Sequence, residues 1–342
     1  MNAPPRTRLR APVAAALTVV LAGGLSGCGA FGGEDVLTVY SGRNENLVGP
    51  ILEQLEDAVG TEVEVRYAGS SDLAAQLLEE GESTDADLFF SQDAGALGAL
   101  AKAGRLAELP QDVLSLVPEQ YADDEGRWVA TSARARVVAY DPRQAPEAAE
   151  MTSVDEVLDE RYRGLIGVAP TNASFQSFVT ALRLDRGEDG AREWLERLVD
   201  LDVQKYDNNI AVLDAVDSGE VALGLINHYY WYERVAEQGE DNVNAEIRFL
   251  DSDDPGALIN VAGVGVIAGS EQEEAAQRAV EFLLSEEAQQ YFADSTAEYP
   301  VVEGITSTEH DLEPLGQGSS VDLNDLDSLE ETLDLLDEVG LT

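Results

Sequence analysis

A repeated strand–loop–helix pattern constrains the fold of this chain more than any other feature of its sequence. Short apolar runs typical of buried strands alternate with segments whose apolar residues recur at helical spacing. The expected strands are 36–40, 62–67, 87–90, 164–169 and 221–226, and the expected helices are 47–59, 71–80, 94–103, 175–186, 191–199, 229–238, 271–294 and 328–339. Such alternation calls for a mostly parallel sheet covered by helices, so we expect an α/β protein.

Two further apolar segments, 136–140 and 259–267, predict strands that connect two α/β lobes. We expect one lobe from residues 36–135 and 264–308, and the other from 136–263 and 309–342. Ligands of such sheets bind at the carboxyl ends of the strands, so the ligand is expected in the cleft between the lobes. The pattern is typical of a solute-binding protein that closes on a small ligand, and it fits a secreted two-domain enzyme equally well.

The first residues have the composition of an export signal. Arg6, Arg8 and Arg10 precede an uncharged apolar stretch over 11–25, which is short for a transmembrane helix. Cys28, the only cysteine, follows Leu-Ser-Gly at the end of that stretch, as in a bacterial lipobox. We therefore predict a lipoprotein signal peptide over 1–27, acylation of Cys28 and a tether over 28–35. An ordinary secretory signal that contains a cysteine is the alternative. Both interpretations place the protein outside the cytoplasm, and the first anchors it to the cell membrane.

The charge of the chain excludes one class of function and indicates an environment. The 67 acidic residues outweigh 21 basic ones, for a net charge of -46, which excludes a general nucleic-acid binder. Only Lys102 and Lys205 are lysines. An acidic, lysine-poor surface is typical of proteins that work in concentrated salt. A GC-rich genome would explain the preference for arginine but not the excess of acids.

Few residues could support catalysis. His228 and His310 are the only histidines, which argues against a His-rich zinc site and against a His-based triad with several candidates. The cleft loops offer only Asp93 and His228 as an acid–base pair. A hydrolase or transferase is therefore disfavoured, and we expect no enzymatic activity.

Tyr229 and Tyr230 stand where the strand 221–226 gives way to a helix. Neighbouring side chains of a strand point to opposite faces, so two adjacent tyrosines can meet one ligand only in a turn or a first helical turn. A helix N-terminus favours anions, and phenolate oxygen is a hard ligand suited to Fe³⁺. A pair that packs in the core or stacks on a sugar remains open on these residues alone.

Six segments connect the chain to a known family. They are Val39-Tyr40-Ser41-Gly42-Arg43, Ala86-Asp87-Leu88-Phe89-Phe90, Ser132-Ala133-Arg134-Ala135-Arg136-Val137-Val138, Leu225-Ile226-Asn227-His228-Tyr229-Tyr230-Trp231, Asp254-Pro255-Gly256-Ala257-Leu258 and Ala297-Glu298-Tyr299-Pro300. In these segments, and from about Leu37 to Gly340, the chain resembles the ferric-iron-binding proteins of bacterial ABC transporters. The resemblance implies a two-lobed, type II periplasmic-binding-protein-like fold with two hinge-crossing strands. It also implies a monomer that carries Fe³⁺ in the interlobe cleft to a membrane permease driven by an ATPase.

The resemblance also implies roles for individual residues. Tyr229 and Tyr230 match the tyrosine pair that ligates iron in the family. The family places a synergistic anion, carbonate or phosphate, beside the iron. The positions that match its anion site are Arg134, Thr171, Asn172, Ala173, Asn209 and Asn227.

Three positions depart from the family pattern. Asn44 stands where well-known members have a histidine ligand, and Gln92 stands where they have a glutamate ligand. Other members use a third tyrosine at the turn that Asn172 occupies here. Two phenolates cancel two of the three charges on Fe³⁺, so our hypothesis is that exogenous anions complete the coordination, with Asn44 and Gln92 on the opposite wall. An iron chelate, an organic cation or an oxyanion is the alternative ligand.

Overall fold

The computed structural model describes residues 36–313, 315 and 321–342. The predicted signal peptide, Cys28 and the tether all lie outside the described residues. The strands are β1 (Val36–Ser41), β2 (Glu62–Tyr67), β3 (Leu88–Ser91), β4 (Val129–Tyr140), β5 (Ile166–Val168), β6 (Gln204–Lys205), β7 (Leu223–Asn227), β8 (Glu246–Arg248), β9 (Ile259–Val266) and β10 (Tyr299–Pro300). The α-helices are α1 (Glu45–Leu52), α2 (Leu55–Val59), α3 (Ser70–Glu80), α4 (Ala94–Lys102), α5 (Gln111–Leu114), α6 (Ala173–Asp200), α7 (Asn209–Ser218), α8 (Tyr229–Gln238), α9 (Glu273–Leu283), α10 (Glu286–Ser295) and α11 (Leu329–Glu338). None of the described helices is both long and apolar enough to cross a bilayer.

The strands form one sheet in the order β2-β1-β3-β9-β4-β7-β5-β6, and β8 and β10 pair with β4 outside this path. The pairs β1–β2, β1–β3, β5–β6 and β5–β7 are parallel, as the strand–loop–helix pattern predicts. The carboxyl ends of β1 and β3 lead into the loops at Gly42 and Gln92, and that of β7 leads directly into α8. These strand ends are where a ligand site is expected.

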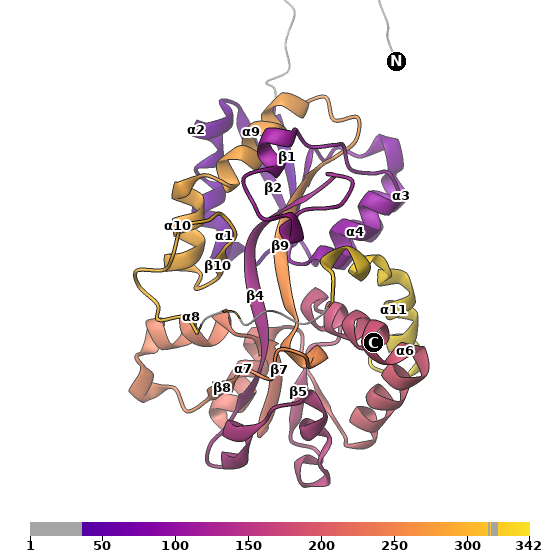
Figure 1. Cartoon of the computed structure of the whole chain (residues 1–342), viewed down its shortest axis with the longest axis vertical. Helices are drawn as coiled ribbons and strands as arrows, with labels where there is room; N and C mark the ends of the chain where they lie inside the picture. Colours follow the sequence, from indigo (N-terminus) through magenta and orange to yellow (C-terminus); the bar gives the residue numbers. More distant parts are fainter. Residues whose placement is uncertain (1–35, 314, 316–320) are drawn as a thin grey trace, which may run out of the picture. The chain divides into compact units, whose positions relative to one another are not determined.

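The strand β4 connects the two halves of the sheet (Figure 1). Its first part, up to Ala135, pairs with β9, and its second part, from Arg136, pairs with β7 and β8. The other connecting strand, β9, pairs with β3 and β4 over its length. Its first residue, Ile259, lies opposite Ala135, where β4 passes from one half of the sheet to the other. The two expected connector strands are therefore present.

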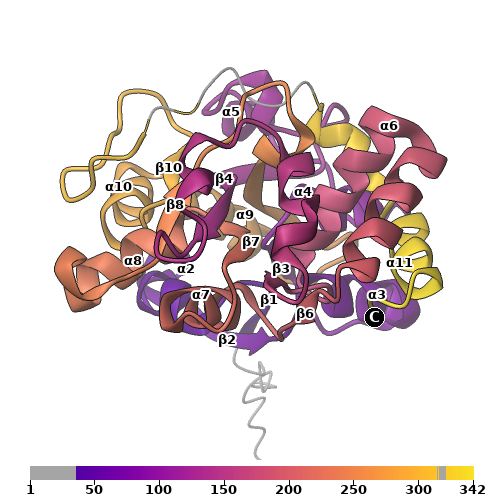
Figure 2. The ribbon, with the colours of Figure 1, turned by 90° about the horizontal axis from the view of Figure 1, so that it is seen from below.

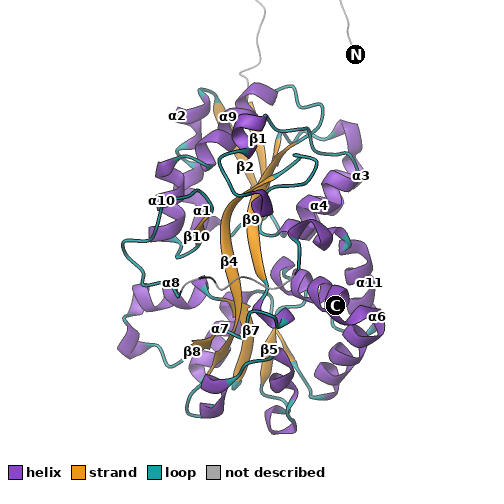
Figure 3. Cartoon of the chain, in the orientation of Figure 1, coloured by secondary structure: helices purple, strands orange, loops and turns teal. Residues whose placement is uncertain are grey.

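Helices cover the sheet on both sides (Figure 3). In two perpendicular views, α3, α4, α6 and α11 lie on one side of β4, and α8 and α10 lie on the other (Figures 1 and 2). Two clusters of buried apolar side chains hold this arrangement: one surrounds β1, β3 and β9 and continues across the hinge, and the other surrounds Phe175, Phe178 and Trp194. Burial of each large apolar side chain contributes about 2 kcal/mol, so two cores can stabilise two lobes.

Several helices differ from expectation at their ends and breaks. The expected helix 47–59 is two helices, and 271–294 is also two, because Ser285 begins a new helix and its hydroxyl accepts a hydrogen bond from the Ala288 amide. The expected helices 175–186 and 191–199 run together as α6, with a kink at Gly187, whose φ of 70° favours glycine.

The lobe limits remain a prediction. By strand pairing, β9 lies entirely with the first lobe. The C-terminal part touches both halves, since a 3-10 helix over Leu323–Asp327 packs on α4 while α11 packs on α6.

Candidate metal and anion site

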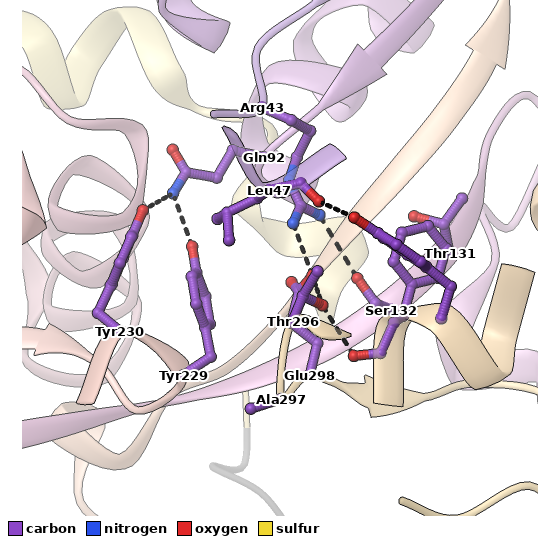
Figure 4. Close-up of polar contacts among 12 residues, drawn as sticks. Arg43, Leu47, Gln92, Thr131, Ser132, Tyr229, Tyr230, Thr296, Ala297 and Glu298 are labelled. Carbon is purple, nitrogen blue, oxygen red and sulfur yellow. Dashed lines mark hydrogen bonds and ion pairs between the residues drawn. The ribbon is translucent and has the colours of Figure 1, made fainter. Parts of the chain in front are cut away.

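Tyr229 and Tyr230 lie side by side at the start of α8 (Figure 4). Their ring centroids are 4.2 Å apart, and both side chains are buried. The amide nitrogen of Gln92, from the other lobe, donates hydrogen bonds to both hydroxyls, at 3.3 Å to Tyr229 and 3.4 Å to Tyr230. The structure therefore brings together the two expected metal ligands and one of the two expected wall residues.

The local chain explains this placement. β7 ends at Asn227, and α8 starts two residues later, so both tyrosines fall in the first helical turn, where the free N–H groups and the helix dipole favour negative charge. Burial, followed by the charge and hydrogen bond of Tyr229, raises the pKa of the Tyr230 hydroxyl well above its ordinary value. The raised pKa keeps Tyr230 protonated at neutral pH, so only a strong cation would supply the driving force to displace the phenolic proton.

A buried ion pair lies beside the tyrosines. The Arg43 guanidinium, in the loop after β1, donates to a Glu298 carboxylate oxygen at 2.6 Å and to the Ser132 hydroxyl at 3.4 Å (Figure 4). Burial works against the charge of Arg43, but Glu298 and the two tyrosines raise the pKa of Arg43 above its ordinary value. The chain motifs carry both residues, yet sequence reasoning assigned neither a role, because their contact joins positions 255 residues apart.

Arg134 is buried without a partner. Only 1% of the residue is exposed, and none of its three guanidinium nitrogens has a hydrogen-bond partner within the described part of the chain. Arg136, two residues on, donates to the Ser174 hydroxyl at 3.2 Å and to the Leu225 carbonyl at 3.0 Å. An unpaired buried guanidinium is costly, so the site suits an anion that would compensate its charge.

The remaining expected anion residues gather at the start of α6. The Asn172 side chain caps the helix by accepting from the Ser174 amide at 3.1 Å, and the Asn209 amide donates to the Asn172 oxygen at 3.1 Å. Thr171 is exposed, whereas Ala173 is buried. Asn227 lies opposite Arg136 on β7, and its buried amide nitrogen has no partner among the residues described. Arg134 and Asn227 thus have free donors, whereas Asn172 and Asn209 bond to each other.

Asn44, the other wall residue, caps α1 by accepting from the Asn46 amide at 2.9 Å. Asn44 also lines a cavity of about 850 Å³, together with Tyr230 and Glu233 of α8. Burial, followed by the Glu298 and Glu237 carboxylates, raises the pKa of Glu233 to about 8. In the described ranges, no three His, Cys, Asp or Glu side chains gather closely enough to hold a metal ion.

Substituting Glu233 by glutamine should stabilise the protein at alkaline pH. The folded state holds a proton on Glu233 up to about pH 8, whereas the unfolded state loses it near pH 4.5. This carboxyl therefore contributes stability that is full below pH 4.5 and is lost as pH rises through 8. The shift from 4.5 to about 8 sets an upper limit of about 5 kcal/mol on this effect. We expect Glu233→Gln to raise the free energy of unfolding by several kcal/mol at pH 9 and to change it little at pH 4.5, in urea titrations. Glu240→Gln, at an exposed position of the same cavity, should have no such effect, and an equal gain in both variants would contradict this account.

His228 has a structural role. Its ring accepts from the Ala135 amide at 3.3 Å, contacts the Ala297 carbonyl at 3.0 Å and stacks on Tyr299. Burial lowers the pKa of His228 to about 4, so the ring is neutral at physiological pH. Through these contacts it joins β4 to the segment before β10.

Comparison with known proteins identifies the family. The family model described as bacterial extracellular solute-binding protein matches residues 83–330. The chain belongs to this family. Members of this family bind solutes outside the cell. Solute binding is the class of function that the sequence predicted, rather than catalysis.

Individual relatives of this solute-binding protein agree with the resemblance in the sequence motifs. It is 33% identical to the major ferric iron-binding protein of Neisseria meningitidis over 89% of this chain and 93% of that one. It is 30% identical to the Fe(3+)-binding periplasmic protein of Serratia marcescens over 89% and 90%. The crystal structure of iron-bound HitA from Pseudomonas aeruginosa is similar with a TM-score of 0.84 and 34% identity, and covers 90% of this chain and 99% of that one. The predicted family and the two-lobed type II fold are confirmed.

Proposed function

We propose that this protein binds Fe³⁺ between its lobes and delivers it to an ABC permease. The observation that carries the proposal is the buried pair Tyr229–Tyr230, which points two phenolic oxygens at one place in a chain whose relatives bind ferric iron. Iron is the cargo of this site and not a resident cofactor. The family places such proteins outside the cytoplasm, and acylation of Cys28 would keep this one at the membrane beside its permease and ATPase.

A ferric titration tests the proposal directly. Purified protein without its predicted signal peptide is titrated with Fe³⁺ in concentrated salt, and the visible absorption of tyrosinate-to-iron charge transfer is recorded. We expect a band that saturates at one equivalent of iron. If no band develops with phosphate, bicarbonate or citrate present, the ligand is an organic cation or an oxyanion instead.

We propose further that an oxyanion completes the iron site at Arg134. The two tyrosines leave one charge of Fe³⁺ uncompensated, Asn44 and Gln92 are neutral, and the unpaired guanidinium of Arg134 needs an anion. Asn227, which pairs with Arg136 across the ladder between β4 and β7, adds a free amide donor. The second possibility is that the protein binds iron as an iron–citrate chelate. A Trichodesmium protein that is 25% identical to this chain has been solved in complex with iron and citrate ligands.

Arg134 and Arg136 should respond to methionine in opposite ways. Without an oxyanion, Arg134→Met removes a buried unpaired charge and should raise the free energy of unfolding by about 1–3 kcal/mol. Arg136→Met breaks two hydrogen bonds and should lower it by a similar amount. Arg134→Met should also abolish the effect of added phosphate on iron affinity. Denaturant titrations measure the two changes in stability, and the ferric titration with and without phosphate measures the change in iron affinity. Loss of stability in Arg134→Met would contradict the proposed role.

A further inference from the structure

Two buried side chains of opposite charge lie in the same region without pairing. Asp93 and Arg134 are each 1% exposed. Burial raises the pKa of Asp93 and lowers the pKa of Arg134, and the charge of each partly offsets the shift of the other. No ion pair within 4.0 Å joins them in the described structure, and Asp93 Oδ2 and the whole guanidinium have no hydrogen-bond partner there. The Arg134 guanidinium and one oxygen of Asp93 therefore bear the cost of burial without a contact that would offset it.

The surrounding contacts fix the carboxyl group in place. Asp93 caps α4, and its Oδ1 accepts hydrogen bonds from the Ala96 amide at 3.0 Å and from the Ser177 hydroxyl of α6 at 3.2 Å. Because Oδ1 is engaged, only Oδ2 remains free. At Gly95 a Cβ atom would lie 3.1 Å from Asp93 Oδ1 and 3.0 Å from the Leu326 carbonyl oxygen, so the backbone packs tightly around this group.

A third free group lies beside them. Asn260 faces Arg134 across the β4–β9 ladder, and directly opposed residues share one face of a sheet. Its oxygen accepts from the Ala94 amide at 3.1 Å, which ties it to the residue after Asp93, while its buried amide nitrogen has no partner in the ranges described. The region thus presents the Arg134 guanidinium and the Asn260 amide as donors and one oxygen of Asp93 as an acceptor.

This combination selects its ligand by chemistry. A group that satisfies all three must accept hydrogen bonds from Arg134 and Asn260 and donate one to Asp93. Sulfate carries only acceptor oxygens at neutral pH and would set its lone pairs against those of the carboxylate. Bicarbonate and the hydrogen phosphates carry both charged oxygens and a hydroxyl.

We propose that the anion subsite takes oxyanions that carry a proton, and that Asp93 is the residue that rejects those without one. The inference deepens the proposed function, because the anion would be the partner of the bound iron. It assigns Asp93 a role in specificity that the family motifs do not give it. Binding of the anion can be measured in the protein without iron.

Calorimetric titration of the iron-free purified protein tests the selectivity. With chloride constant at pH 7.5, we expect inorganic phosphate to bind at least about tenfold more tightly than sulfate, because an unmet carboxylate acceptor costs more than 1 kcal/mol. Equal binding of the two anions would overturn the inference. So would binding of neither, since water would then bridge Asp93 and Arg134.

Asp93→Asn is the decisive variant. Asparagine caps a helix as well as aspartate does, so α4 should remain intact, while the second side-chain atom becomes an N–H donor. We expect sulfate to bind this variant at least as tightly as phosphate. Asp254→Asn is the matched control, because Asp254 also caps a helix through its carboxylate, and it should keep the preference for phosphate. A folded Asp93→Asn protein that still prefers phosphate would overturn the inference.

The ferric titration separates this inference from the proposed function. If the iron band forms but sulfate supports it as well as phosphate does, the inference fails and the ferric function stands. If phosphate is preferred in the iron-free protein but no iron band forms, the inference stands and the ferric function fails.

Discussion

Replacing both Tyr229 and Tyr230 with phenylalanine should abolish the ferric charge-transfer band and weaken Fe³⁺ binding by at least about a thousandfold, or about 4 kcal/mol. The two hydroxyls share Gln92 as their hydrogen-bond partner, so their oxygens lie close to one point. Without phenolates, neutral amides and one buried ion pair cannot balance a trivalent cation.

The single variants separate the contributions of the two tyrosines, and one control tests whether any tyrosine of α8 would have the same effect. Each of Tyr229→Phe and Tyr230→Phe should keep a shifted band of lower intensity, because one phenolate remains. Tyr232→Phe is the matched control: it lies on the same helix, and its hydroxyl donates to the Asp311 carbonyl at 3.5 Å, away from the pair. Iron affinity is measured by competition with citrate. A full band in the double variant would show that iron binds elsewhere.

Much of the fold followed from the sequence because its signals are local. Strand–loop–helix alternation indicated the class, and the apolar runs near 136–140 and 259–267 indicated the crossing strands. The position of Tyr229 and Tyr230 at a strand–helix junction was also predictable, whereas their role as ligands stays a prediction. Breaks inside helices were less predictable, because a kink at Gly187 or a new cap at Ser285 depends on how neighbouring segments pack.

The polar partners of the site could not be predicted in the same way. Arg134 faces Asn260 only because of the register between β4 and β9, which no local pattern specifies. Asp93 was recognised as a cleft residue but only as half of an acid–base pair. Its free oxygen beside an unpaired guanidinium is a property of the assembled interior. Glu298 was part of a motif, but its partner Arg43 follows the first strand of the chain.

Glu298→Gln should be among the most destabilising single substitutions in the protein. The side chains of Arg43 and Glu298 are 1% and 0% exposed, so loss of the negative charge leaves a buried guanidinium with only neutral acceptors, the glutamine amide oxygen and the Ser132 hydroxyl at 3.4 Å. Breaking one partner of a buried pair costs about 3–5 kcal/mol, which should lower Tm by roughly 10 °C. The uncompensated cation also lies beside the tyrosines, so iron affinity should fall together with stability.

Two further variants distinguish loss of pairing from loss of a carboxylate. Glu303→Gln changes an exposed glutamate five residues away and should leave Tm and iron affinity unchanged. Adding Arg43→Met to Glu298→Gln removes the orphaned charge, so the double variant should recover most of the lost stability, because replacing a whole buried pair with apolar groups is often neutral. Thermal unfolding of the wild type, Glu298→Gln, Arg43→Met and the double variant gives the coupling energy between Arg43 and Glu298. If the double variant is as unstable as the sum of its single variants, the two side chains act independently and the ion pair does not hold this part of the site together.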